Sequence, residues 1–292
     1  MLIEGFAYCD GCGVKIAWPR IQPFQKPPVS KEIFTAINRK VVEKLVDYGR
    51  GKRLLGSGGI LLASGMQSEA HEFLITNPLA FLIGIINAEA VSAEAFFSVP
   101  YRLRNLLGHL DPYRVGNMPY DELAQALRQC RGLCRKIPRY IQQGCRKIVK
   151  EYRGNAENIW NDCPTSTALV VRFDAFNGVG QKKSTMAANI LVRDLGVKVK
   201  NDDWSGINVS YDQQAGHVGR VFLRAGLVEV DKMRAVIEAA RRLNPSWPGA
   251  LDLPAWLIGR EWCHKNNPSC DNCPINSVCP SRENMKIAFK SI

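Results

Sequence analysis

Apolar residues recur every three or four positions along most of the chain, which is the spacing of amphipathic helices. The pattern predicts helices over residues 93–107, 119–130, 137–152 and 165–176, separated by short segments containing Gly, Pro or Asn. Further helices are expected within 30–52, where Ser30 can cap the start, and over 253–263. The two-residue alternation typical of strands is scarce, and no repeat has solenoid spacing. We therefore predict an all-α fold.

The longest apolar run is PLAFLIGIINAEAV at 78–91, which contains Glu89 and is too short to span a bilayer. It predicts a buried helix. The chain begins MLIEGFAYCDGCGVK, without the cationic start and long apolar stretch of a signal peptide. We therefore expect no membrane partner, and a cytoplasmic, nucleoid-associated protein.

Composition bounds the function. Of the 292 residues, 46% are hydrophobic, which is enough to build a core and excludes wholesale disorder. Lysine and arginine number 39 against 27 acidic residues, giving a net charge of +12. That surplus suits a polyanion, most often a nucleic acid, although a merely basic soluble enzyme would have the same charge.

Four of the ten cysteines lie together near the end of the chain. Cys263, Cys270, Cys273 and Cys279 have the spacing C-x6-C-x2-C-x5-C. Structural zinc sites usually have two close cysteine pairs, whereas this segment has one pair flanked by two single cysteines. One encircling loop with four thiolates suits a 4Fe-4S cluster, and zinc remains the alternative.

A second motif is FNGVGQKK at 176–183. Its glycines allow a tight turn before a helix, whose free N–H groups and dipole can bind a phosphate. Lys182 and Lys183 follow directly. Either both bind phosphate, or the adjacent like charge favours loss of a proton from one of them, which then acts as a nucleophile.

The cysteine loop, with the preceding WLIGREWC, resembles the iron–sulfur loop of the endonuclease III family of helix-hairpin-helix DNA glycosylases. The hairpin resembles the same family's L-P-G-V-G-x-K-x-A motif. The matching positions are Gly178, Val179, Gly180 and Lys182, while Phe176, Asn177 and Ser184 depart from it. Over residues 76–282 the resemblance implies a two-lobed helical fold, a 4Fe-4S cluster, duplex DNA as partner and base-excision repair as function.

By the same resemblance, Lys182 falls on the family's Schiff-base lysine. A neutral amine there would attack C1′ of a flipped, damaged nucleotide, expel the base and allow strand cleavage by β-elimination. The implied activity is that of a DNA N-glycosylase, with or without abasic-site lyase activity.

The family's aspartate belongs to a V-D-x-H-I/V-x-R-V stretch, and here its position is occupied by Ala215, two residues before His217. Asp212 lies three residues earlier. Three alternatives follow: a rearranged loop brings Asp212 into the role, Lys182 acts without that partner, or the protein is a catalytically inactive iron–sulfur DNA-binding protein. RNA binding, or a zinc-adaptor role, is a further alternative.

The resemblance also predicts a set of DNA contacts. Glu89 replaces the family glutamine that fills the gap left by a flipped base, and is either a lesion reader or a solvent-facing helix residue. His217 is either a DNA contact or a structural hydrogen-bonding residue at a helix start. The full set expected at DNA is Gly178, Val179, Gly180, Gln181, Lys183, Glu89 and His217.

The predicted domains are an N-terminal extension over 1–75, a cluster lobe formed by 76–105 and 222–292, and a helical barrel over 106–221. Cys9 and Cys12 in the extension would make half a zinc site, without an obvious second pair. Cys130 and Cys134 are expected to pack on one helix face. We expect a monomer.

Overall fold

The computed structural model describes residues 7–8, 15–16, 36–55, 65–89, 91–131, 136–213 and 216–282, and divides the chain into units Met1–Thr35 and Ala36–Ile292. The first unit contains two short antiparallel strands, β1 (Ala7–Tyr8) and β2 (Lys15–Ile16), with Ala7 opposite Ile16. Cys9 and Cys12, which would make half a zinc site, lie outside the described residues.

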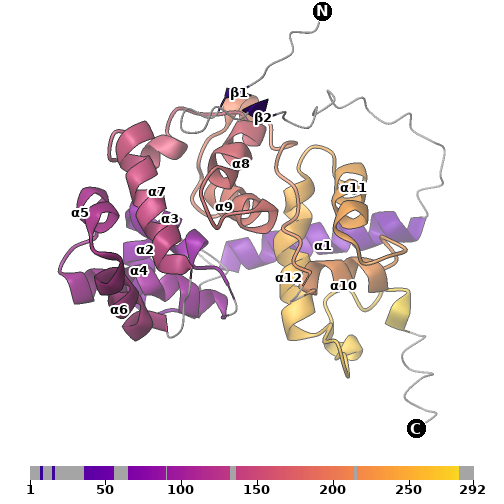
Figure 1. Cartoon of the computed structure of the whole chain (residues 1–292). Coiled ribbons are helices and arrows are strands. Elements are labelled where there is room, and N and C mark those ends of the chain that lie inside the picture. Colours follow the sequence, from indigo (N-terminus) through magenta and orange to yellow (C-terminus); the bar gives the residue numbers. More distant parts are fainter. Residues whose placement is uncertain are drawn as a thin grey trace, which may run out of the picture. The chain divides into compact units, whose positions relative to one another are not determined.

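The second unit is helical and contains two hydrophobic clusters, which confirms the predicted all-α class (Figure 1). We call the part built on the first cluster the hairpin lobe. Its helices are α2 (Ser68–Thr76), α3 (Pro78–Ile86), α4 (Ala93–Leu107), α5 (Pro112–Asn117), α6 (Tyr120–Arg131), α7 (Ile137–Glu151), α8 (Ser166–Asp174) and α9 (Gln181–Arg193), with a 3-10 turn η2 (Ala156–Ile159).

The other part is called the cysteine lobe. It comprises α1 (Ala36–Leu55), α10 (His217–Arg224), α11 (Met233–Leu243), α12 (Asp252–Glu261) and the cysteine loop at 263–279, with short 3-10 turns η4 (Pro248–Leu251) and η5 (Cys270–Asn272). A segment without helix or strand at 207–212, which follows η3 (Lys200–Asp202), connects the two lobes.

Polar residues at the helix starts explain several boundaries. Ser92 accepts a hydrogen bond from the N–H of Ala95 at the start of α4, and Thr165 accepts one from Ala168 at the start of α8. Such caps satisfy backbone donors that a helix leaves unpaired. Helix α4 ends at Gly108, whose φ of 72° is favourable for glycine. The helices therefore begin and end close to the predicted positions.

The hairpin lobe is organised around α3, in which every residue from Leu79 to Ile86 is buried. Phe81 contacts Trp160 and Phe173 edge-on, so aromatic rings fill the space between α3 and α8. Within the described residues no single helix is long and apolar enough to cross a membrane; α2 and α3 reach that hydropathy only together and are bent by 105°. Residues 78–86 of the 78–91 run form a buried core helix, as predicted, and residues 87–89 lie in the turn after it.

The predicted domain boundaries need correction. Val41 and Leu45 of α1 are fully buried in the cluster that contains α10, α11 and α12, so residues 36–55 belong to the cysteine lobe and not to a separate extension. Figure 1 shows α1 beside α12. Conversely, α3 and α4 pack into the hairpin lobe, although 76–105 were assigned to the cluster lobe.

The second boundary also moves. Val209 and Tyr211 are buried in the cluster of the cysteine lobe, whereas Ile207 belongs to the hairpin lobe, so the lobes meet near residue 208 and not at 221.

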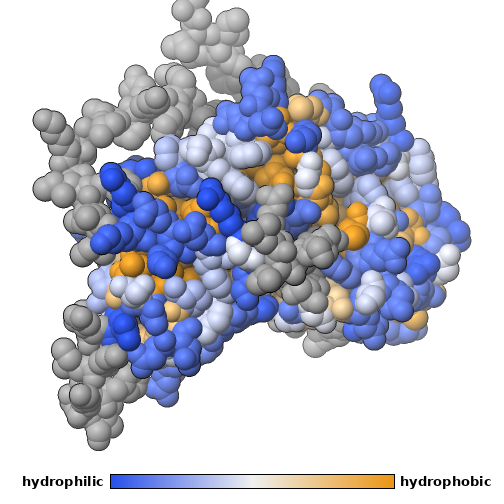
Figure 2. Space-filling model, turned by 180° about the vertical axis from the view of Figure 1, so that it is seen from behind, coloured by the Kyte–Doolittle hydropathy of each residue, from blue (hydrophilic) through white to orange (hydrophobic). Residues whose placement is uncertain are grey.

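Cys130 is buried in the hairpin lobe, while Cys134 lies outside the described residues. On the face shown in Figure 2, hydrophilic residues predominate and the hydrophobic ones are visible in smaller areas between them.

Candidate functional site

The turn between α8 and α9 is shaped by Gly178. Its φ is +80°, and a Cβ atom added there would lie 2.3 Å from Cδ2 of Tyr140. Glycine is therefore required both by the backbone conformation and by the neighbouring ring. The N–H of Val179 donates to the carbonyl of Phe176, and both side chains are buried, which fixes the turn on the hairpin lobe.

Gly180, unlike Gly178, has open space where a side chain would be. It precedes α9 with an extended backbone (φ −106°), and a Cβ atom added there would meet nothing within 4 Å. No side chain caps the start of α9. The open space at Gly180 thus lies beside backbone N–H groups and the positive end of the helix dipole, which is an arrangement suited to a phosphate.

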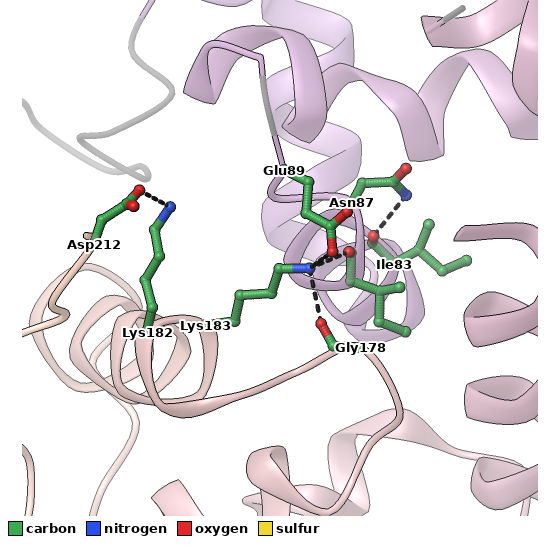
Figure 3. A network of polar contacts seen from close by, with 8 residues as sticks. Ile83, Asn87, Glu89, Gly178, Lys182, Lys183 and Asp212 are labelled. Carbon is green, nitrogen blue, oxygen red and sulfur yellow. Dashed lines mark hydrogen bonds and ion pairs between the residues drawn. The ribbon is translucent and has the colours of Figure 1, made fainter. Parts of the chain in front are cut away.

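Lys182 and Asp212 form an ion pair across the two lobes. Nζ of Lys182, in the first turn of α9, lies 2.5 Å from Oδ2 of Asp212, at the end of the connecting segment (Figure 3). The Lys182 side chain is 39% exposed and that of Asp212 22% exposed. The structure therefore brings these two residues together, and solvent can reach both. Ala215 lies outside the described residues.

Lys183 points away from Lys182 and into the protein, as Figure 3 shows. Its side chain is 8% exposed, and Nζ donates to the carbonyl oxygens of Ile86 and Gly178 and to Oε1 of Glu89, each at 2.8 Å. The ammonium joins the hairpin turn to the end of α3. This arrangement does not support the expected contact between Lys183 and DNA, because its donors are engaged inside the protein.

Glu89 lies in the turn between α3 and α4, not in a helix, and its side chain is 49% exposed. The ion pair with Lys183 holds it at the edge of the hairpin. Its role as a lesion reader stays a prediction. The alternative was a solvent-facing helix residue, and Glu89 does face solvent but does not lie in a helix.

His217 begins α10 and faces α12. Its ring packs edge-on against Trp256, and its Nδ1 lies 3.1 Å from a guanidinium nitrogen of Arg220. Burial lowers the pKa of His217, and the charge of Arg220 adds to this, while the carbonyl of Gly259 and the charge of Asp212 oppose it. These contacts favour the structural role of His217 over the expected contact with DNA.

The four cysteines of the loop line one pocket, together with residues of α10 and α12. Burial raises the pKa of Cys273 and the charges of neighbouring cysteines add to this, which together bring it to about 11 although a hydrogen bond from the backbone of Ile275 opposes the rise. Burial also raises the pKa of Cys270 and of Cys279. Four thiolates gathered in this place therefore need a positive partner, because burial and mutual repulsion both oppose their charge.

A tight zinc tetrahedron and a larger cluster place different demands on these thiols. Among the described residues, no group of three or more His, Cys, Asp or Glu side chains has the geometry to hold a metal ion. The cysteines instead surround a pocket, and a cluster is larger than a single ion. The donor set thus fits a cysteine-bound iron–sulfur cluster in its chemistry.

Two arginines of α10 hold the start of the cysteine loop. Arg220 donates to the carbonyl oxygens of Cys263 and Gly259, at 2.6 and 2.8 Å. Arg224 donates to the carbonyl of His264 at 2.6 Å and lies 3.5 Å from Sγ of Cys263. Because the two arginines are four residues apart, they lie on one face of the helix and reach the same loop.

Solved structures with the same arrangement of helices include two complexes of endonuclease III with DNA. One is non-covalent, with 20% sequence identity, 86% of this chain and 98% of that chain covered, and a TM-score of 0.58. The other is a trapped covalent intermediate, with 22% identity, 72% and 86% covered, and a TM-score of 0.54. The chain has the endonuclease III-like fold.

A thermostable thymine-DNA glycosylase has the same fold, at 15% identity, with 85% of this chain and 97% of that chain covered and a TM-score of 0.56. No protein-family model matches the sequence, and none of the curated proteins matches it. The endonuclease III-like fold therefore rests on the arrangement of the helices and not on overall sequence similarity.

Within this fold, three residues hold the site without having been indicated by the sequence motifs. Ser210 is part of the segment that carries Asp212 and donates to Asp252, and Asn189 of α9 donates to the carbonyl of Asn208 in the same segment. Gln181, Thr185, Asn189 and Arg193 recur at intervals of four residues, a polar face that helical spacing could have indicated.

Proposed function

We propose that the protein is a DNA glycosylase of base-excision repair that acts on a damaged or mismatched base in duplex DNA, and that Lys182 is its nucleophile. The observation that carries this is the ion pair between Lys182 and Asp212 at the start of α9. It places a reachable amine and a proton acceptor together where the hairpin can hold a phosphate.

The chemistry requires a neutral amine. Transfer of a proton from Lys182 to Asp212 leaves Nζ with a free electron pair, which attacks C1′ of the flipped nucleotide. The new N–C1′ bond forms as the bond from C1′ to the base breaks. The base departs with the electron pair of the broken bond and takes up the proton held by Asp212.

Strand cleavage would follow from the same adduct. Ring opening would break the C1′–O4′ bond, move an N–H proton of the adduct to O4′ and leave a protonated imine between Lys182 and C1′, which makes the proton on C2′ acidic. Asp212, ionised again after giving its proton to the base, would accept the C2′ proton. The electron pair of that C–H bond would form the C2′–C3′ double bond as the C3′–O bond breaks, so that the 3′ phosphate leaves with its electron pair.

DNA binding is assigned to the hairpin. Gly178 sets the turn, Gly180 leaves the approach open, and the N–H groups of α9 face the backbone phosphate. These contacts fix the position of the duplex without reading its sequence. The net charge of +12 supports binding to DNA at low salt.

Cys263, Cys270, Cys273 and Cys279 would hold a 4Fe-4S cluster. Such a cluster would supply structural cross-links within the loop and no step of base removal. Arg220 and Arg224 would orient the loop against α10 from their bonds to its carbonyl groups.

The test is reductive trapping with borohydride on a duplex that contains one abasic site. We expect the unmodified protein to form a covalent adduct and Lys182→Ala to form none. Asp212→Asn should slow adduct formation by about 10–100-fold, since the proton acceptor is lost. The matched control is Lys198→Ala, because Lys198 is exposed and lies beyond the end of α9.

A second measurement separates the catalytic proposal from the non-catalytic one. Base release is followed on duplexes that each carry a different damaged or mismatched base, with duplex affinity measured alongside. No adduct and no base release, with binding retained, would contradict the enzyme and leave an iron–sulfur DNA-binding protein. An adduct that persists in Lys182→Ala would contradict the assignment of the nucleophile.

A further inference from the structure

The segment at 207–212 lies outside the helices and strands that the structure describes, and it carries Asp212 at its end. Its backbone polar groups therefore find partners other than those of a helix or a sheet. The carbonyl of Ile207 accepts from the N–H of Gly249 at 3.0 Å. The next three residues are bonded to side chains, and these bonds determine where Asp212 lies.

One face of α9 supplies part of this support. Nε2 of Gln181 donates to the carbonyl of Val209 at 3.1 Å, and Nδ2 of Asn189 donates to the carbonyl of Asn208 at 2.8 Å. Asn189 is fully buried. The helix that carries Lys182 therefore also binds the backbone of the segment that carries Asp212.

Helix α12 adds support through Asp252, beside the bonds that Asn208 makes to Ile237 and Tyr211 makes to Asp231. Oδ1 of Asp252 accepts from both the backbone N–H and the hydroxyl of Ser210, at 2.6 and 2.7 Å. Asp252 is 4% exposed and Ser210 is 8% exposed. Two short bonds to one oxygen fix both the position and the rotation of Ser210, which is two residues before Asp212.

The surroundings of Asp252 act on its pKa in opposite directions. Burial raises the pKa of Asp252, while the bonds from Ser210 and the charges of Arg193 and Lys182 lower it. Burial of an acidic group costs free energy unless its oxygens are hydrogen-bonded, and the two bonds from Ser210 supply that compensation here. Asp252 is therefore bound directly to the segment 207–212.

We propose that Asp252 is a positioning residue for Asp212, acting through Ser210, so that the carboxylate of Asp212 stays within reach of Lys182. The inference rests on the proposed function, because positioning matters most if Lys182 and Asp212 react with DNA. Asp252 itself does not touch the nucleotide. It holds the reacting pair to the narrow geometry that proton transfer needs.

The test compares Asp252→Ala with Asp252→Asn in the full chain. The asparagine keeps an oxygen that can accept both bonds from Ser210, whereas alanine removes it. We expect adduct formation with an abasic duplex to slow by about 30-fold in Asp252→Ala and by less than about 3-fold in Asp252→Asn. Duplex affinity should change by less than about 3-fold in both.

Two further variants calibrate this comparison. Ser210→Ala keeps the N–H bond and loses the hydroxyl bond, so we expect a smaller loss of about 3-fold and a variant that still folds. Asp203→Ala is the matched control. Asp203 accepts from the N–H of Ser205 at 2.9 Å in the same residue combination, but at the surface and away from Lys182. Its adduct rate should match that of the unmodified protein.

Hydrogen exchange gives a readout that does not depend on activity. Peptides covering 207–213 should exchange at least 10-fold faster in Asp252→Ala than in Asp252→Asn, while the peptides of α3 stay protected. Equal adduct rates in the two variants, or unchanged exchange in Asp252→Ala, would overturn the inference. If the unmodified protein forms no adduct, the proposed function fails, and exchange alone decides whether Asp252 holds the segment.

Discussion

The hairpin turn between α8 and α9 is closed by protein contacts alone, whereas the cysteine loop after α12 encloses a pocket lined by thiols. In the hairpin, buried side chains and the ammonium of Lys183 satisfy the turn from within. In the loop, Arg220 and Arg224 bind backbone carbonyls at one end, and the four cysteines line one pocket. The hairpin is therefore expected to form without a cofactor, and the loop to depend on one.

The largest expected effect tests the proposed dependence of the loop on a bound cluster. If Cys273 is a ligand as proposed, Cys273→Ser should lower the free energy of unfolding of the cysteine lobe by several kcal/mol, on the order of 5. Iron content, visible absorption and thermal unfolding measure it, and chelation of the metal should reproduce it. Cys163→Ser is the control, because Cys163 is exposed and lies in the hairpin lobe. Equal effects of the two changes would contradict the distinction.

Next in size is a pair of changes within the hairpin. Gly178→Ala should lower the free energy of unfolding by about 3 kcal/mol, since the alanine would have a strained φ and clash with Tyr140. Gly180→Ala should lower it by less than about 1 kcal/mol, because the added methyl meets open space. Denaturant titration measures both.

For DNA affinity we expect the opposite order, with the larger effect at Gly180 and the smaller one at Gly178. The methyl group of Gly180→Ala projects where a phosphate would approach, so we expect duplex binding to weaken by about 10-fold while the fold remains intact. Unchanged affinity in a folded Gly180→Ala protein would show that the strand does not pass there.

Substitution of the two adjacent lysines should also lower the free energy of unfolding by different amounts, and this difference is smaller than the one between the two glycines. Lys183→Met leaves the carbonyls of Ile86 and Gly178 without this donor, and we expect a loss of about 2 kcal/mol. Lys182→Met should change stability by less than about 1 kcal/mol, because its ion pair is partly exposed. Thermal unfolding of the two variants at one pH compares them directly; a larger loss in Lys182→Met would contradict the assigned roles.

The smallest expected effect is the titration of His217. Its pKa in the folded protein lies below its usual value, so the unfolded chain takes up a proton first as the pH falls. Stability is therefore complete above about pH 6.5 and is lost as the pH falls from there toward the folded pKa. We expect this loss to be smaller than the effects above, because the imidazole is partly exposed and solvent screens its charge, and denaturant titration across this range measures it. His217→Gln should flatten the profile, and His264→Gln, at an exposed position, should not.

Local motifs predicted the parts of the site that adjacent residues build. The glycines of the hairpin and the spacing of the four cysteines gave the turn and the pocket, because each depends on the chain within about twenty residues. The pairing of Lys182 with Asp212 was one of three alternatives. It depends on a segment 30 residues away, whose path the sequence does not encode locally.

Amphipathic patterns did not indicate which core each helix would join. Val41 and Leu45 mark one face of α1, but nothing in their spacing shows that this face packs on α12. In the same way, two adjacent lysines looked alike in the sequence. The burial of Lys183 follows from the carbonyl groups of Ile86 and Gly178, which come together only in the folded chain.

The polar face of α9 has a mechanical consequence. Hydrogen bonds from Gln181 and Asn189 to the backbone at 208–209 have short reach and narrow angles, so sliding α9 along this segment would break both at once. Apolar surfaces can slide past each other without losing directional bonds, whereas the contact between α9 and residues 208–209 cannot. Any opening of the two lobes around a duplex should therefore be a rotation about this contact, with Lys182 and Asp212 next to the rotation axis.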